Sequence, residues 1–90
     1  MKEIFSEKYE YKQQCFIIKV FRDDRGWEGK GFLEDGEDVP NTGVYFESKI
    51  VIEAQQRGLL NDPVEGIVKL VKESLRIQVD QKNDGREALC

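Results

Sequence analysis

The segment that decides the fold is Cys15-Phe16-Ile17-Ile18-Lys19-Val20-Phe21. It is rich in β-branched and aromatic residues and lacks glycine and proline, which is typical of a β-strand. A turn-forming cluster, Arg22-Asp23-Asp24-Arg25-Gly26, follows it directly. Since side chains alternate between the faces of a strand, Phe16, Ile18 and Val20 share one face, and further apolar residues occupy the other. A strand that is apolar on both faces is predicted to be central in its sheet, and this one to enter a hairpin.

Upstream of this segment, aromatic and charged residues alternate from Tyr9 onward. Tyr9 and Tyr11 share the parity of Ile17, so we expect all three on the same face of one strand. That strand is predicted to cover residues 9–21. Because it exceeds the usual strand length, we expect a bend or bulge near Gln13-Gln14.

Downstream, residues 27–33 are predicted to form the return strand of the hairpin. With a four-residue loop the strands pair as Arg22–Trp27, Val20–Gly29, Ile18–Gly31 and Phe16–Leu33. Glycine leaves room for a close neighbour, so we expect a helix to cover Gly29 and Gly31. The opposite face pairs Ile17 with Phe32 and Lys19 with Lys30, and such a like-charge pair is tolerated only in water. We therefore predict one helix-covered face and one open face.

The acidic residues, glycine, proline and asparagine that follow Leu33 predict a loop, and residues 43–47 a short third strand. Residues 48–57 allow two interpretations. The run Ile50-Val51-Ile52 favours a strand, whereas Ser48 as an N-cap favours a helix. Gly58 followed by Leu59 also fits a helix end with its hydrophobic contact, and we predict a helix.

Residues 63–76 carry the clearest helix signals. Asp62 suits the N-cap and Pro63 the first helical position. Apolar residues recur at the spacing of one helix face, namely Val64, Ile67, Val68, Val71 and Leu75. The alternation of Leu75, Ile77 and Val79 leaves a short fourth strand as an alternative.

These elements predict a single α+β domain over residues 1–79. It consists of a three-stranded antiparallel sheet with one or two C-terminal helices packed on one face. Residues 1–8 are expected to be frayed, and residues 80–90 to form a flexible C-terminal tail. The residues expected to be buried together are Ile18, Val20, Ile67, Val71 and Leu75.

The composition excludes several classes of function. No histidine occurs, which removes histidine-dependent catalysis and zinc sites, and no phosphate-binding glycine motif is present, so we expect neither an enzyme nor a cofactor. The net charge of −4 disfavours a mainly electrostatic grip on nucleic acid. Cys15, expected to be buried, and Cys90 are predicted to be free thiols of a cytoplasmic protein. No signal peptide or membrane-spanning run is found.

Two features suggest protein binding. We define the acidic loop as Glu34, Asp35, Glu37 and Asp38, and we expect it to dock on a basic partner. Two alternatives are a solvated turn without a binding role and a cation site, although the spacing is not that of an EF-hand loop. Trp27 beside Arg25 would serve as an anchor, or would instead cap the end of the helix-covered face. The leading hypothesis is a non-enzymatic adaptor or inhibitor that acts through the acidic loop and the open face. We also expect that it could form a homodimer through an edge strand.

The alternative is a domain that binds single-stranded nucleic acid. Aromatic and basic residues on an open sheet face can stack bases and contact phosphates. The residues that would do so here are Tyr9, Tyr11, Lys12, Lys19 and Lys30. A third hypothesis places a small ligand or a metal at the junction of sheet and helix.

Between Phe16 and Trp27, a strand is followed by an Asp-Asp-x-Gly-Trp turn and a return strand that leads to helices. This arrangement is similar to the opening of the small HicB-like antitoxins, which bind partner toxins and sometimes nucleic acid. The resemblance covers about a dozen residues, and the Pro-Gly that such proteins usually show after the second strand is missing here. No function and no site residue is carried over from it.

Overall fold

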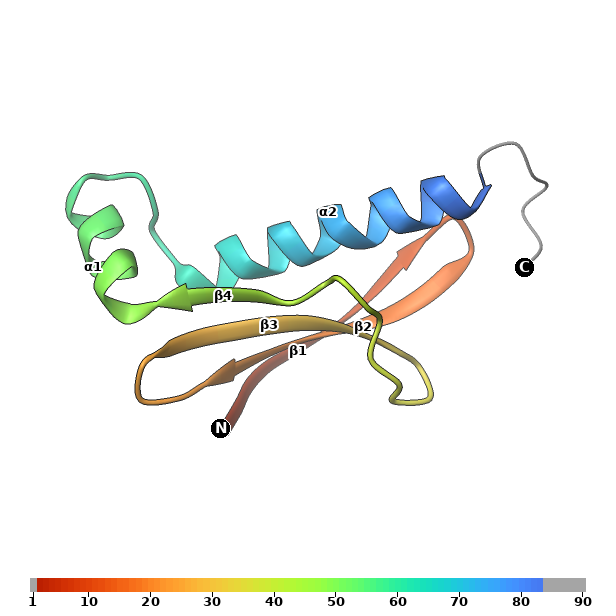
Figure 1. Cartoon of the computed structure of the whole chain (residues 1–90), viewed down its shortest axis with the longest axis horizontal. Coiled ribbons are helices and arrows are strands. Elements are labelled where there is room, and N and C mark those ends of the chain that lie inside the picture. The colour runs from red at the N-terminus through yellow and green to blue at the C-terminus, as the bar shows by residue number, and fades with distance from the viewer. Residues whose placement is uncertain (1, 84–90) are drawn as a thin grey trace.

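The computed structural model describes residues 2–83, and the side chains of residues 2–81. Its elements in chain order are β1 (Lys2–Tyr11), β2 (Gln14–Arg22), β3 (Gly26–Leu33), β4 (Val44–Glu47), α1 (Ser48–Gln56) and α2 (Pro63–Asn83). The strands form one antiparallel sheet in the order β1-β2-β3-β4, and α2 lies along one face of it, whereas α1 sits beyond the end of β4 (Figure 1). The α+β class is confirmed, but the sheet has four strands rather than three.

The additional strand arises from a tight turn that the sequence analysis treated as a bulge. Lys12 and Gln13 have φ values of 51° and 67°, and Tyr11 pairs directly with Gln14. Two successive residues with positive φ form the two-residue turn that best fits the twist of a hairpin. The prediction of one continuous strand over residues 9–21 was therefore wrong, and residues 2–8, expected to be frayed, belong to β1.

This reversal of the chain changes the face on which two tyrosines lie. Tyr9 is paired with Phe16, a buried core residue, so Tyr9 and Tyr11 lie on the face that α2 covers. Their predicted place on the open face was wrong. The Tyr11 hydroxyl donates a hydrogen bond to Asp80 of α2 at 3.1 Å, and Lys12 Nζ lies 2.6 Å from the same carboxylate.

The register between β2 and β3 agrees with the prediction at every pair, from Phe16–Leu33 to Arg22–Trp27. The five residues expected in the core are all fully buried, and they are Ile18, Val20, Ile67, Val71 and Leu75. Gly29 lies directly beneath Ile67, and Gly31 lies beneath Leu75. Helix α2 therefore rests on β3 at the two positions where no side chain intervenes.

Helix α1 confirms the prediction of a helix after β4, with two differences at its ends. The N-cap is Glu47, which makes no capping bond, and the Ser48 hydroxyl instead accepts a hydrogen bond from Arg22 at 3.1 Å. Gly58 has a φ of 73° and ends the helix as expected. Leu59 is 76% exposed, so the predicted hydrophobic contact of this cap is not made.

Helix α2 begins as predicted but ends later. Asp62 accepts a hydrogen bond from the Val64 N–H at 2.9 Å, which confirms its role as the cap. The helix continues to Asn83, so the alternative of a strand near Leu75 and Val79 was wrong, as was the helix end at residue 76. Val79 is buried, because the apolar stripe continues by one more turn than was predicted. Residues 80–83, assigned to the flexible tail, are helical, and residues 84–90 lie outside the described residues.

The bonds to Asp80 predict a pH dependence for this end of α2. The hydrogen bond from Lys12, and then that from Tyr11, lower the pKa of Asp80. Because the pKa of Asp80 is lower in the folded than in the unfolded chain, the ionised carboxylate stabilises the folded state. This stabilisation is fully present above the unfolded pKa of about 3.9 and is lost as the pH falls through the folded pKa. We expect a carbon-13 NMR titration to place the Asp80 pKa below 3.9 and Lys12→Met to raise it. An unchanged pKa in that variant would contradict the contact.

Candidate functional site

The open face is the side of the sheet that α2 leaves uncovered. The register places side chains from adjacent strands in rows across it, for example Lys8, Ile17 and Phe32 in one row. We define the open face by its lysine, isoleucine and aromatic side chains, which are Lys8, Ile17, Lys19, Phe21, Lys30, Phe32 and Tyr45.

The centre of the open face is apolar and aromatic. The rings of Phe21 and Phe32 pack edge to face with their centroids 6.5 Å apart, and both side chains are half-buried, as is Ile17. Tyr45 lies at one side and is 46% exposed. The Lys19–Lys30 pair lies between the Ile17–Phe32 row and Phe21, so charges are present within the patch. Aromatic residues are enriched in protein-binding surfaces.

Two of the three lysines of this face, Lys19 and Lys30, are each paired with an acid. Lys19 lies 3.4 Å from Glu3, and Lys30 lies 2.6 Å from Asp38. The hydrogen bond between Lys30 and Asp38 raises the pKa of the lysine and lowers that of the carboxyl group. The predicted side-by-side position of Lys19 and Lys30 is confirmed, and the nearby acids offset their repulsion.

The acidic loop is joined to the open face. Asp38 forms a β-bridge with Phe32, and the Leu33 N–H donates to the Glu37 carbonyl at 2.7 Å. The Glu37 N–H donates to the Asp35 side chain at 2.9 Å, which fixes the turn. Asp38 is engaged by Lys30, whereas the other three acids are exposed at the edge of the face.

Trp27 and Arg25 lie at the opposite end of the hairpin from the acidic loop. Trp27 is on the helix side, is half-buried against the core, and stacks with Arg22 at 4.0 Å. The sequence analysis offered two roles for Trp27, a binding anchor or a cap at the end of the helix-covered face. Its observed position is that of the cap. Arg25 is exposed in the turn, where its N–H donates to Asp23 at 2.8 Å. The structure does not bring either residue together with the acidic loop.

The five residues of the nucleic-acid hypothesis are also divided. Tyr9 and Tyr11 stack on the helix side with centroids 6.5 Å apart, and Lys12 lies beside them. Lys19 and Lys30 lie on the open face, each against an acid. Lys72 of α2 lies over the Tyr9 ring as Lys12 lies over the Tyr11 ring, so the helix side holds a short group of two rings and two lysines. The five predicted residues do not form one strip on a single face.

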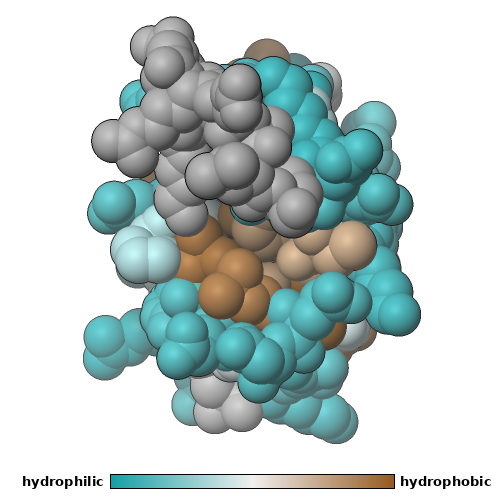
Figure 2. All heavy atoms as spheres, turned by 90° about the vertical axis from the view of Figure 1, so that its right-hand side faces the viewer, coloured by the Kyte–Doolittle hydropathy of each residue, from teal (hydrophilic) through white to brown (hydrophobic). Residues whose placement is uncertain are grey.

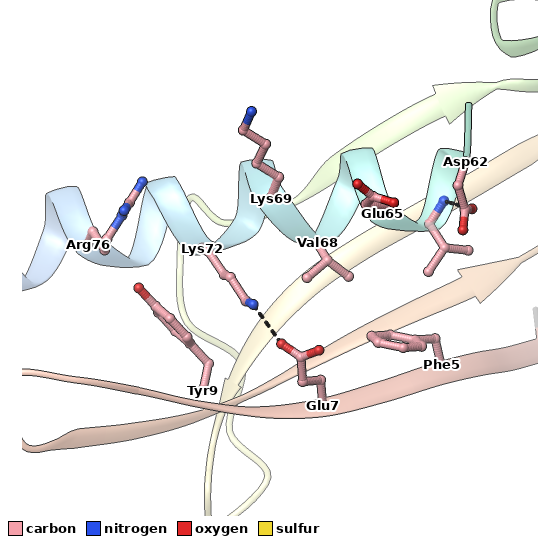
Figure 3. A pocket seen from close by; sticks show the side chains of 10 residues that line it. Phe5, Glu7, Tyr9, Asp62, Glu65, Val68, Lys69, Lys72 and Arg76 are labelled. Atoms are coloured by element: carbon pink, nitrogen blue, oxygen red, sulfur yellow. Dashed lines mark hydrogen bonds and ion pairs between the residues drawn. The ribbon is translucent and has the colours of Figure 1, made fainter. Parts of the chain in front are cut away.

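A groove between β1 and α2 was missed by the sequence analysis. It has a volume of about 530 Å³, and its apolar wall consists of Phe5 and Tyr9 from β1 with Val64 and Val68 from α2 (Figure 3). An ion pair between Glu7 and Lys72, 2.7 Å long, crosses it (Figure 3). The alternation of residues 5, 7 and 9 could have indicated this wall, but only after the turn at residues 12 and 13 had been recognised.

A second apolar hollow lies at the end of the molecule that Figure 2 faces, where brown side chains are seen with hydrophilic ones below them and to the sides. A pocket of about 370 Å³ at the end of α2 is lined by apolar residues that include Phe16, Leu33, Val39, Leu75 and Val79. All of these apolar residues except Leu33 belong to the core cluster, so we interpret the pocket as an open end of the core.

The remaining features of the described residues concern metal ligands, the free thiol and membrane-spanning helices. Among them, no three cysteine, aspartate or glutamate side chains are grouped as metal ligands would be. Cys15 is exposed on the open side rather than buried as expected, and desolvation together with the Glu34 and Glu10 carboxylates raises the pKa of its thiol. No helix within residues 2–83 has the length and apolar character needed to cross a membrane.

Comparisons with protein-family models, with curated proteins and with solved structures found no match for this chain.

Proposed function

We propose that this chain is a non-enzymatic, cytoplasmic protein–protein interaction module that binds its partner through the open face and the acidic loop. The observation that carries the proposal is the half-exposed group of Ile17, Phe21 and Phe32 on the uncovered side of the sheet. A free, exposed thiol at Cys15 supports a reducing compartment.

The two parts of the surface would contribute differently to binding. The apolar centre would supply affinity, because aromatic and aliphatic side chains that become fully desolvated dominate the energy of interfaces. The exposed acids Glu34, Asp35 and Glu37 would accelerate the encounter with a basic surface. The partner is therefore expected to present an apolar patch with a basic region beside it.

The test is affinity capture from extracts of the source cells with wild type, Ile17→Glu and Leu70→Glu. Ile17→Glu places a charge at the centre of the open face, whereas Leu70 is exposed on α2, away from the sheet, and serves as the matched control. We expect wild type and Leu70→Glu to retain the same partner after nuclease treatment, and Ile17→Glu to lose it. Equal capture by all three proteins, with equal thermal stability, would contradict the proposal.

The acidic loop gives a prediction that separates a protein partner from nucleic acid. In the triple variant Glu34→Gln, Asp35→Asn and Glu37→Gln we retain Asp38, because it pairs with Lys30. We expect folding to be unchanged and association with the captured partner to be slower, most clearly at low salt. Nucleic acid would respond in the opposite direction, because its binding tightens when negative charge is removed. Surface plasmon resonance over a salt series measures both.

A further inference from the structure

Strand β1 leaves a long edge of the sheet unpaired. It has ten residues, and among the described residues only β2 pairs with it. Tyr11 and Gln14 flank a two-residue turn and so exchange backbone hydrogen bonds, after which inward and outward residues alternate along the strand. The backbone N–H and C=O groups of Ser6, Lys8 and Glu10 consequently point away from the sheet, as a template for another strand.

The groove described above lies beside this edge on the helix side. A strand added to β1 would place every second side chain toward the groove, where Phe5 and Tyr9 are only half-buried. Edge-strand addition of this kind combines backbone hydrogen bonds with side-chain contacts in an adjacent groove.

We propose that a second copy of this chain binds along β1, antiparallel to it, with a two-fold axis at Ser6. The four strands of each copy then form one continuous sheet, and both α2 helices lie on the same side of it. The argument for this occupant is the self-complementarity of the β1 side chains in that register.

Centring the pair on Ser6 sets no like charges directly opposite each other. Ser6 faces Ser6 of the second copy. Phe5 faces Glu7 of the second copy, together with the alkyl part of the Lys72 side chain that forms an ion pair with that Glu7. A bulge between Glu3 and Phe5 places Glu3 on the open side, opposite Phe21, so that it faces Lys8 of the second copy. Two Lys8–Glu3 pairs result, one on each side of the axis.

Other registers with the same alternation are less favourable. An axis at Glu7 sets two glutamates against each other, and it also brings Glu10 against Glu3. An axis at Lys8 opposes two lysines. An axis at Phe5 or at Tyr9 avoids these conflicts. The first leaves most of the strand toward Tyr11 without a partner, and the second leaves residues 2–6 without one.

This dimer does not rest on the proposed function, because it uses the β1 edge and the groove, and of the residues that define the open face it involves only Lys8, which lies on the edge strand itself. A two-fold axis perpendicular to the sheet would place both open faces on the same side. A partner with two binding sites could then engage both copies at once, which raises avidity without new contacts.

The first experiment measures mass by sedimentation equilibrium over a concentration series of the full chain. We expect wild type and Ser6→Ala to form a dimer. We expect Ser6→Pro to raise the dissociation constant by about tenfold or more, because each copy loses an outward N–H donor while the bonds to β2 remain. A monomer at every concentration, or equal association of Ser6→Pro and Ser6→Ala, would overturn the proposal.

The second experiment tests the register by cross-linking under mild oxidation in a Cys15→Ser, Cys90→Ser background. Opposite residues of an antiparallel pair have Cα atoms about 5.5 Å apart, within the range of a disulfide. Ser6→Cys is therefore expected to form a covalent dimer. Lys8→Cys is the matched control, because its two copies would lie about 13 Å apart along the strands. Efficient cross-linking of Lys8→Cys, with none in Ser6→Cys, would overturn this register even if a dimer forms.

Discussion

Ile18→Ala is expected to lower the free energy of unfolding by about 2–5 kcal/mol. Ile18 is fully buried, it lies at the centre of β2, and it belongs to the cluster that joins the sheet to α2. Removing three carbons there loses the transfer free energy of the side chain and leaves a cavity that rigid neighbours fill only in part. Denaturant melts of wild type and variant, with equal slopes, measure the difference.

The adjacent residue provides the matched control. Ile17 has the same side chain on the same strand, but it points to the open face and is only half-buried. Ile17→Ala is therefore expected to cost distinctly less than Ile18→Ala. A loss below about 0.5 kcal/mol for Ile18→Ala, which is typical of surface positions, would contradict the burial of this face.

The β2–β3 hairpin could be predicted from the sequence because several local signals agreed. An apolar strand, a turn cluster and a second strand with glycines at alternate positions allow one register in which both glycines lie under the helix. The same agreement held for α2, where Asp62, Pro63 and the apolar stripe all indicated one helix. Its C-terminal end was missed, since the contact of Asp80 with Tyr11 and Lys12 links distant parts of the chain.

The β1–β2 hairpin could not be predicted, because its turn lacks the usual residues. Hairpin turns with positive φ at both central positions favour Asn-Gly or Asp-Gly, and this one contains Lys12-Gln13. The alternation of side chains along a strand predicts which face each one occupies only within one uninterrupted strand, because a turn restarts the pattern. A single unrecognised turn therefore moved Tyr9 and Tyr11 to the wrong face and concealed the groove.

The candidate site was predictable only where it depended on β2 and β3. Ile17, Phe32, Lys19 and Lys30 lie together on the open face as their register implied. The bond between Asp38 and Lys30 could not be foreseen, because the sequence does not show how a loop folds back on its strand.

Gly29→Ala is expected to lower the free energy of unfolding by about 1–3 kcal/mol or more, although alanine restricts the unfolded chain and often stabilises. A Cβ atom at Gly29 would overlap Cγ2 of Ile67, a fully buried side chain of α2. The helix would have to move away from β3, and the packing of Val71 beside it would loosen as well.

Gly31→Ala is the control that separates this overlap from a general effect of replacing glycine in a strand. Its Cβ would lie 3.1 Å from Cδ2 of Leu75, a contact that a few tenths of an ångström of movement relieves. The expected order of stability is therefore wild type, then Gly31→Ala, then Gly29→Ala.

Double variants test whether Ile67 is the side chain that the new Cβ atom meets. Ile67→Val shortens the side chain but keeps Cγ2, so in the Gly29→Ala background the overlap is expected to persist. Ile67→Ala removes Cγ2 and should cost less in the Gly29→Ala background than in wild type, and a double-mutant cycle measures that coupling. Additive losses would show that Gly29 and Ile67 do not touch, and would contradict the seating of α2 on β3.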